Sequence, residues 1–184
     1  TRALEESCDV WFYEVAQKAG IDQIAEMGRA LGLGIRHDLP MSAITEGAMP
    51  DKAWLQERYK QEWRVGDTIN ASIGQGYVLT SPLQLAVMAA RIASGKQVNP
   101  RLIHMVDGVA QPVADAPALQ VEKAHLDVVR RGMYDVMNGN RGTAKSSRIA
   151  DETMLMAGKT GTAQVRNISS SERASGVRSN DQLP

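Results

Sequence analysis

The chain has 184 residues, of which 43% are hydrophobic and 23% charged, a composition typical of one globular domain rather than a disordered segment. Its 21 basic and 21 acidic residues give a formal net charge of zero, and no basic cluster is interleaved with aromatic side chains, so the sequence predicts no nucleic-acid partner. The single cysteine, Cys8, excludes an internal disulfide and a cysteine-based metal site.

Membrane and targeting signals are absent from these residues. The longest uncharged stretch, residues 68–90, contains amides, a proline and several glycines, so it predicts no membrane span. The chain has no initiator Met and no basic start followed by an apolar segment. Any targeting signal or anchor is therefore expected outside these residues.

The first third of the chain predicts a pair of helices, residues 10–19 ending at Gly20 and residues 21–31 ending at Gly32. Between residues 35 and 67, two prolines interrupt the pattern, and only residues 52–59 are predicted to be helical.

The strongest local signal is a helix that begins after Ser81. Ser81 is a predicted N-cap, Pro82 occupies the first helical position, and Gln84 completes a capping box. The helix is apolar almost all round until Gly95, which predicts burial on most sides.

The remaining pattern is mixed. Residues 98–106 are predicted to be extended, residues 108–117 a surface connection, and residues 126–137 a helix that the polar run 138–142 terminates. Residues 154–165 are predicted to be a strand, and the serine-rich tail after Arg166 shows no periodicity.

The segment Gly158-Lys159-Thr160-Gly161-Thr162-Ala163 is the sharpest short motif. It is not a phosphate-binding loop, because position 153, which must be glycine, is Thr153. In an extended segment, Lys159 offers a cation to a carboxylate, and Gly161 lets a peptide backbone approach closely. The three histidines have no metal-ligand spacing, so no metal and no cofactor are predicted.

The run Ser7-Cys8-Asp9 lies upstream of Lys159-Thr160-Gly161. Penicillin-binding proteins carry three short motifs, and these two runs match two of them in the same order. Together with several intervening blocks, the chain resembles the transpeptidase domain of class B penicillin-binding proteins, and in particular the elongation-type penicillin-binding protein 2 branch, which carries Asp at position 9. Residues 34–40 match the family only in part. The other matching blocks are 10–13, 66–70, 72–77, 80–85, 142–144 and 158–165.

The resemblance implies an α+β fold like that of serine β-lactamases, an antiparallel sheet flanked by helices. Residues 1–184 are then expected to be a partial domain that lacks the upstream Ser-x-x-Lys region and the downstream sheet strands. No serine in these residues has a lysine three positions later, so the nucleophile is expected upstream, and this chain alone is expected to be inactive and of low stability.

The resemblance also implies the chemistry and the site. The family forms an acyl-serine from a peptidoglycan stem peptide ending in D-Ala-D-Ala and passes the acyl group to a neighbouring stem, and β-lactams mimic the donor. Ser7 would relay protons, Asp9 would hold its loop and contact the substrate amide, and Lys159 would attract the terminal carboxylate. The hydroxyls of Thr160 and Thr162 would bind that carboxylate beside Gly161, and the N–H of Thr162 would form half of an oxyanion hole.

The resemblance places the full protein at the periplasmic face of a bacterial inner membrane, with a membrane glycosyltransferase and elongation-complex proteins as partners. Two alternatives stay open: a β-lactam hydrolase or sensor with the same motifs, and a non-catalytic module that contacts cell-wall synthesis proteins. Cys8 is interpreted as a small buried residue, and Gln75 and Tyr77 as parts of the core and the cleft floor.

Overall fold

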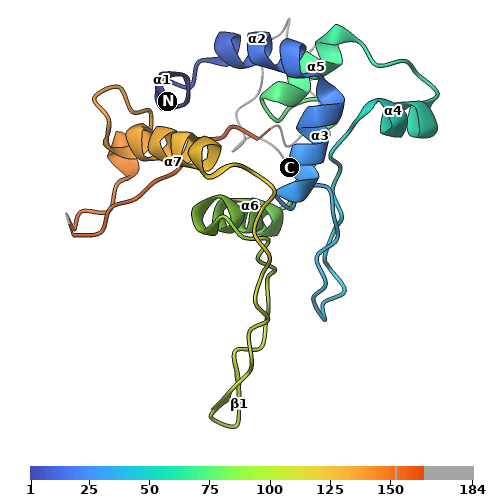
Figure 1. The fold of residues 1–184 in the computed structure, drawn as a ribbon. Helices are drawn as coiled ribbons and strands as arrows, with labels where there is room; N and C mark the ends of the chain where they lie inside the picture. The colour runs from blue at the N-terminus through green and yellow to red at the C-terminus, as the bar shows by residue number, and fades with distance from the viewer. Residues whose placement is uncertain (152, 164–184) are drawn as a thin grey trace, which may run out of the picture.

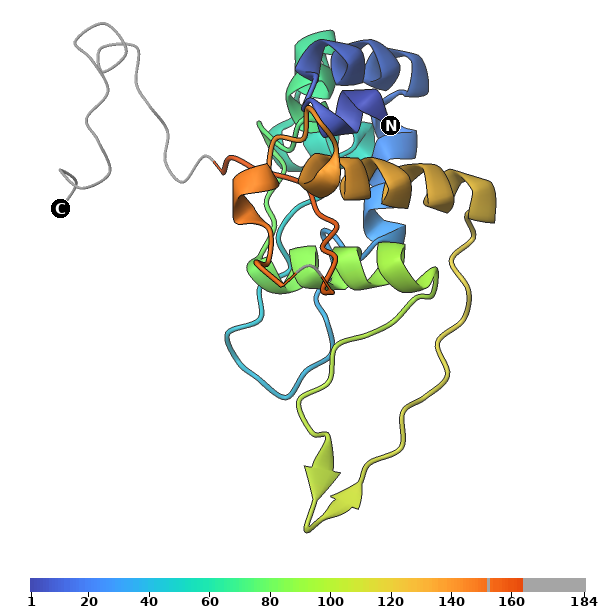
Figure 2. The ribbon, with the colours of Figure 1, turned by 90° about the vertical axis from the view of Figure 1, so that its left-hand side faces the viewer.

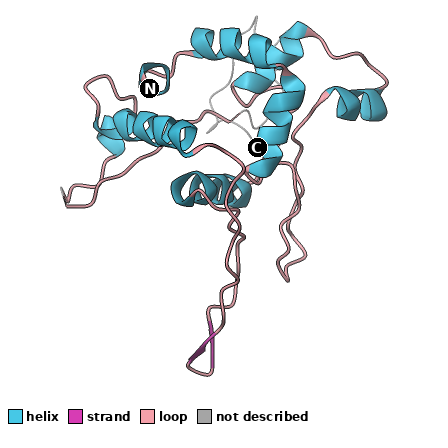
Figure 3. Cartoon of the chain, in the orientation of Figure 1, coloured by secondary structure: helices cyan, strands magenta, loops and turns pink. Residues whose placement is uncertain are grey.

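The computed structural model describes residues 1–151 and 153–163, which form a body of helices with a thin arm projecting from it (Figures 1 and 2). Helices dominate the described part, and the arm ends in one antiparallel pair of strands (Figure 3). The elements in chain order are α1 (Arg2–Glu5), α2 (Asp9–Ala19), α3 (Ile21–Ala30), α4 (Lys52–Tyr59), α5 (Val65–Ser72), α6 (Pro82–Ser94), β1 (Met105–Val106), β2 (Val109–Ala110), α7 (Lys123–Asn138) and the 3₁₀ turn η1 (Lys145–Ser147).

Helix α6 begins and ends as its sequence predicts. The Ser81 hydroxyl accepts from the Gln84 backbone N–H at 3.3 Å, the Gln84 side chain accepts from the Ser81 N–H at 3.2 Å, and Gly95 ends the helix in the left-handed conformation. The buried Gln84 amide also donates to the carbonyls of Ile35 at 2.8 Å and Glu46 at 2.7 Å. One capping residue therefore fixes both the start of α6 and the long loop beside it.

The predicted burial of α6 on most sides is wrong for the described residues. Only Gln84, Val87 and Arg91 are buried, and Leu85 is 44% exposed. The helix packs on α7, which crosses the body beside it (Figures 1 and 2). No described element covers its opposite, alanine-rich face.

A buried arginine joins α6 to two other segments. Arg91 donates to the carbonyl of Ala30 at 2.8 Å, to the carbonyl of Val98 at 3.0 Å and to Oδ1 of Asn99 at 2.9 Å. Burial lowers the pKa of this guanidinium. We expect Arg91→Met to lower the free energy of unfolding by about 3 kcal/mol, because it removes three partly buried hydrogen bonds from a charged donor.

The unfolding midpoint in denaturant measures this cost. The matched control is Arg101→Met, since Arg101 is exposed and, among the described residues, donates to a single carbonyl, that of Gln111 at 3.2 Å. The control is expected to leave the midpoint almost unchanged. Equal midpoints for the two variants would show that the buried network contributes no stability.

Helix α1 lies on α7 because Gly132 makes room for it. A Cβ atom at position 132 would stand 2.6 Å from Cδ1 and 3.1 Å from Cβ of Leu4, so a larger residue would displace the Leu4 side chain. Beyond this contact, α7 packs through Val136 and Met137 against Ala144. Helix α7 thus connects the start of the chain with its last described segment.

Several predicted elements differ from the structure. Helices α1 and α5 were not predicted, and residues 98–106 contain only the two-residue strand β1, whose partner β2 lies in the predicted surface connection. Residues 154–163 form no strand, since no described strand lies alongside to pair with them. Residues 164 and 165 and the serine-rich tail lie outside the described residues.

Within residues 1–151 and 153–163, no helix has both the length and the apolar content needed to cross a membrane. The same residues contain no group of histidine, cysteine and acidic side chains that could hold a metal ion.

Candidate active site

Ser7 lies in a tight turn between α1 and α2. Its φ of 52° is in the left-handed region, which is uncommon for a residue with a side chain. The turn is closed by the Ser7 N–H, which donates to the Leu4 carbonyl at 3.2 Å, and the Cys8 N–H, which donates to the Ala3 carbonyl at 2.9 Å. The turn directs the chain from α1 into α2, with Cys8 as the N-cap of α2.

Residues that follow α7 hold this turn in place. The Thr143 N–H donates to the Glu5 carbonyl at 3.3 Å, and the Arg141 N–H donates to the Glu5 carboxylate at 3.0 Å. The Arg141 guanidinium also pairs with Glu6 at 2.8 Å. Hydrogen bonds from Arg2 and from Arg141 hold the pKa of the Glu6 carboxyl below its ordinary value. The Ser7 turn is therefore fixed from two sides by charged groups.

Lys159 meets Ser7 across 152 positions of sequence. Its ammonium donates to Ser7 Oγ at 2.7 Å and to the carbonyl and hydroxyl oxygens of Thr160, both at 3.0 Å. Thr143 Oγ1 lies 3.1 Å from Ser7 Oγ and 3.4 Å from Thr160 Oγ1. We call these four residues, Ser7, Thr143, Lys159 and Thr160, the Ser7–Lys159 cluster.

The Lys159 ammonium is a partly desolvated cation, and it dominates the electrostatics of the Ser7–Lys159 cluster. Desolvation lowers the pKa of the Lys159 ammonium, and the Asp9 carboxylate opposes this effect more weakly. Asp9 is the first residue of α2, is exposed, and its carboxylate accepts no hydrogen bond from another described residue. A cation beside three hydroxyls can bind a carboxylate, and a lysine with a lowered pKa can exchange protons with the Ser7 hydroxyl.

The segment after Lys159 is open to solvent on one side. Apart from its chain neighbours, no atom of the described residues lies within 4 Å of the place where a Cβ of Gly161 would stand. Thr162 is exposed, and its carbonyl accepts from the side-chain amide of Gln75 at 2.9 Å. The structure thus brings Lys159 and Thr160 to Ser7 and leaves the surface above Gly161 accessible to a peptide.

Two residues of this site were not predicted as site residues. Thr143 lies in one of the blocks that carry the family resemblance, but its contact with Ser7 depends on how α1 packs. Gln75 was interpreted as part of the core or the cleft floor, and its amide reaches Thr162. Only the resemblance of the blocks 72–77 and 142–144 could have pointed to them.

Two other interpretations have clear outcomes. Cys8 is exposed, so its interpretation as a small buried residue is wrong, since the N-cap position places it outside the body of α2. His37 is buried, and its Nε2 lies 3.1 Å from the Gly32 carbonyl oxygen, so it is a hydrogen-bonded core histidine.

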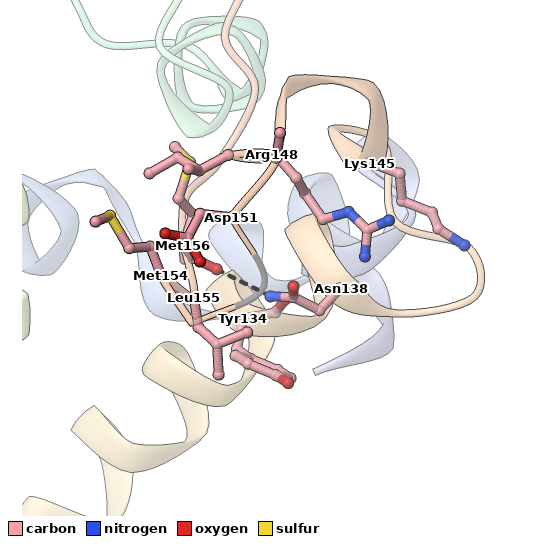
Figure 4. A pocket seen from close by; sticks show the side chains of 10 residues that line it. Tyr134, Asn138, Lys145, Arg148, Asp151, Met154, Leu155 and Met156 are labelled. Carbon is pink, nitrogen blue, oxygen red and sulfur yellow. Dashed lines mark hydrogen bonds between the residues drawn. The ribbon is translucent and has the colours of Figure 1, made fainter.

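A pocket lies beside the segment that leads to Lys159 (Figure 4). Asn138 stands in it, with its amide donating to the Met156 carbonyl at 2.9 Å, and the Gly158 N–H donates to the Met133 carbonyl at 3.0 Å. These bonds hold the segment on the C-terminal half of α7. None of the four residues of the Ser7–Lys159 cluster lines this pocket.

Comparison with known proteins identifies the family. Residues 1–177 match the family model described as the penicillin binding protein transpeptidase domain. The chain belongs to this family. The peptidoglycan D,D-transpeptidase MrdA of Haemophilus influenzae is 36% identical over 178 residues, which are 94% of this chain and 27% of that protein. The chain thus spans about a quarter of the length of this curated relative.

Solved penicillin-binding protein structures match the fold. The structure of Pseudomonas aeruginosa PBP2 in complex with WCK 5153 aligns with a TM-score of 0.79 and 37% identity, over 89% of this chain and 38% of that one. Helicobacter pylori PBP2 in its complex with MreC aligns with a TM-score of 0.77 and 35% identity, over 89% of this chain and 30% of that one. The transpeptidase fold expected from the resemblance is confirmed.

Proposed function

We propose that the protein containing this chain is a peptidoglycan D,D-transpeptidase that cross-links stem peptides during cell elongation. The observation that carries the proposal is the 2.7 Å hydrogen bond from Lys159 to Ser7, which joins the two motifs that the sequence separates. The donor substrate is a stem peptide ending in D-Ala-D-Ala. The acyl-accepting serine is proposed to lie outside these 184 residues, which contain no Ser-x-x-Lys.

In the first half of the reaction, the serine hydroxyl gives up its proton to a base as its oxygen attacks the carbonyl carbon of the penultimate D-Ala, and this proton balances the one that the leaving nitrogen later takes up. The peptide C–N bond breaks, and the terminal D-Ala leaves after its nitrogen receives a proton through Ser7. The Lys159 ammonium and the hydroxyls of Thr160 and Thr162 bind the terminal carboxylate, and the Thr162 N–H stabilises the developing oxyanion.

In the second half, the amine of a neighbouring stem attacks the acyl-serine ester. A new peptide bond forms, the amine loses a proton, and the serine hydroxyl is restored. Ser7 accepts from Lys159 and lies within hydrogen-bond reach of Thr143, so its own proton can be directed toward the substrate nitrogen. Asp9 contributes a negative charge that favours the charged form of Lys159.

We further propose β-lactams as inhibitors and cell-wall synthesis proteins as partners. The H. pylori relative is in complex with MreC, which supports partners of the elongation complex, and a membrane glycosyltransferase would supply the glycan strands. Such a role places the protein at the periplasmic face of the inner membrane.

Labelled penicillin tests the proposal. Intact-mass spectrometry is run on this chain and on the extended protein, meaning this chain within its complete transpeptidase domain. We expect a stable penicilloyl adduct on the extended protein only, at a serine upstream of residue 1. A folded extended protein without an adduct would favour the non-catalytic module, and an adduct that is lost within seconds would favour a β-lactam hydrolase.

A further inference from the structure

The turn that follows α5 has a fixed geometry. Gly74 and Gly76 both have left-handed backbones, with φ of 74° and 71°, which residues with a side chain adopt only at a cost. Between them, the Gln75 N–H donates to the Asn70 carbonyl at 2.9 Å. The backbone of Gln75 is therefore held against the end of α5, and its side chain leaves the turn from a defined point.

Aromatic packing holds the far side of the same turn. The Tyr77 ring stands 5.8 Å from the Trp54 ring and 6.5 Å from the Trp63 ring, centroid to centroid. Trp63 in turn donates through Nε1 to the hydroxyl of the buried Thr68, at 2.8 Å, within α5. The turn is thus anchored on both sides of Gln75, which limits the reach of its side chain to a small region.

The Gln75 side-chain amide contacts the proposed substrate-binding segment, residues 159–162. Its Nε2 donates to the Thr162 carbonyl at 2.9 Å, across 87 positions of sequence. At the other end of the segment, Lys159 is attached to Ser7 at 2.7 Å. The four residues 159–162 are therefore held at both ends.

Both attachments start from one packed unit. Helix α5, which carries the Gln75 turn, packs against α2, and α2 begins two residues after Ser7. A shift of α5 relative to α2 would therefore move Thr162 relative to Ser7. The amide also suits its task, because it is a neutral donor that adds no charge beside Lys159.

We propose that Gln75 is a positioning residue of the transpeptidase reaction, which sets the backbone orientation of Thr162 relative to Ser7. This inference rests on the proposed function. The hydroxyl and the N–H of Thr162 belong to the residue whose carbonyl Gln75 holds, so the bond restrains both groups that are assigned to the substrate. Gln75 itself need not touch the substrate.

The test compares Gln75→Met and Gln75→Glu in the extended protein. Both variants keep the length of the side chain, and both lose the amide donor at neutral pH. The matched control is Gln97→Met, which removes another exposed glutamine amide that donates to a carbonyl, that of Ala118 at 3.4 Å, on the arm. All four proteins are first compared by thermal unfolding.

Acylation by a fluorescent penicillin is then resolved into the dissociation constant of the first complex and the rate constant of acylation. For both Gln75 variants we expect the rate constant to fall by about tenfold and the dissociation constant to change by less than about threefold, because the orientation rather than the presence of the Thr162 groups is altered. If Gln75 had a purely structural role, its variants would have a lower unfolding temperature, but the rate constant of acylation would not fall selectively relative to the dissociation constant.

Hydrogen exchange of the peptide containing residues 158–163 gives a readout that needs no acylation. Faster exchange in Gln75→Met, but not in Gln97→Met, is expected. Acylation and exchange equal to those of the wild type would overturn the inference and leave the proposed function intact. A folded wild-type protein that penicillin never acylates would instead overturn the proposed function, together with the positioning role of Gln75.

Discussion

Replacement of Gly142 by alanine is expected to lower the free energy of unfolding by about 3 kcal/mol and the rate of penicillin acylation by more than about tenfold. A Cβ atom at this position would stand 2.3 Å from the Val136 carbonyl oxygen and 2.6 Å from that of Asp135. Both are backbone atoms of α7, which cannot rotate away as a flexible side chain can. The loop after α7 must shift instead.

A shift of the loop after α7 reaches the Ser7–Lys159 cluster through Thr143, the residue that follows Gly142. Thr143 is bonded to the Glu5 carbonyl by its N–H and lies 3.1 Å from Ser7 Oγ by its hydroxyl. A displaced Thr143 releases the Ser7 turn, whose strained φ of 52° depends on its surroundings. Stability and acylation should therefore fall together.

Denaturant unfolding and acylation of the extended protein measure both effects. The control is Gly66→Ala, in an exposed position of α5 where no atom lies within 4 Å of the added Cβ. Alanine favours a helix over glycine by roughly 0.5–1 kcal/mol, so this variant should be slightly more stable. If Gly142→Ala matched Gly66→Ala in both assays, the close packing of the loop on α7 would be disproved.

Helix α6 could be predicted because its signals are local. The bonds between Ser81 and Gln84 span three residues, and Gly95 needs only its own backbone freedom. Helix α5 lacks such a signal, since its N-cap is Arg64, and the bond that supports its start is donated by the Arg64 N–H to the Asp67 carboxylate at 2.9 Å. Four-residue α1 is too short to show periodicity.

The site was predicted by resemblance and could not have been derived from spacing. Ser7 and Lys159 meet only because α1 packs on α7 at Gly132 and because α7 holds the segment before Lys159. Thr143 and Gln75 join the site through the same long-range packing, so no local pattern predicts their contacts. In the described part of the strand predicted over residues 154–165, residues 154–163, no strand forms for a related reason: a strand needs a neighbour, which a sequence window does not reveal.

Replacement of Lys159 by methionine is expected to lower the rate of penicillin acylation of the extended protein by at least about a hundredfold. The variant removes the cation that is proposed to attract the carboxylate, and it removes the donor to Ser7 Oγ at 2.7 Å. Methionine keeps most of the apolar volume of the lysine stem, so the unfolding temperature should change little. A methionine variant acylated as fast as the wild type would remove Lys159 from the mechanism.

The pH profile of the same reaction tests the charge of Lys159 directly. Desolvation lowers the pKa of its ammonium below the ordinary value of 10.5, and the Asp9 carboxylate raises it by a smaller amount. The positive charge is therefore lost, as the pH rises, earlier than for a free lysine. We expect acylation to decline on the alkaline side with a midpoint below 10.5.

Asp9→Asn separates this charge effect from a merely structural one. Among the described residues, Asp9 is the group that raises the pKa of Lys159, so its removal should move the alkaline decline to a lower pH. Lys159→Arg should abolish the decline in this range, because a guanidinium stays protonated above pH 12. A decline that moves upward in Asp9→Asn, or that persists in Lys159→Arg, would mean that a group other than Lys159 titrates. The three profiles together therefore assign the charge that binds the carboxylate to a single side chain.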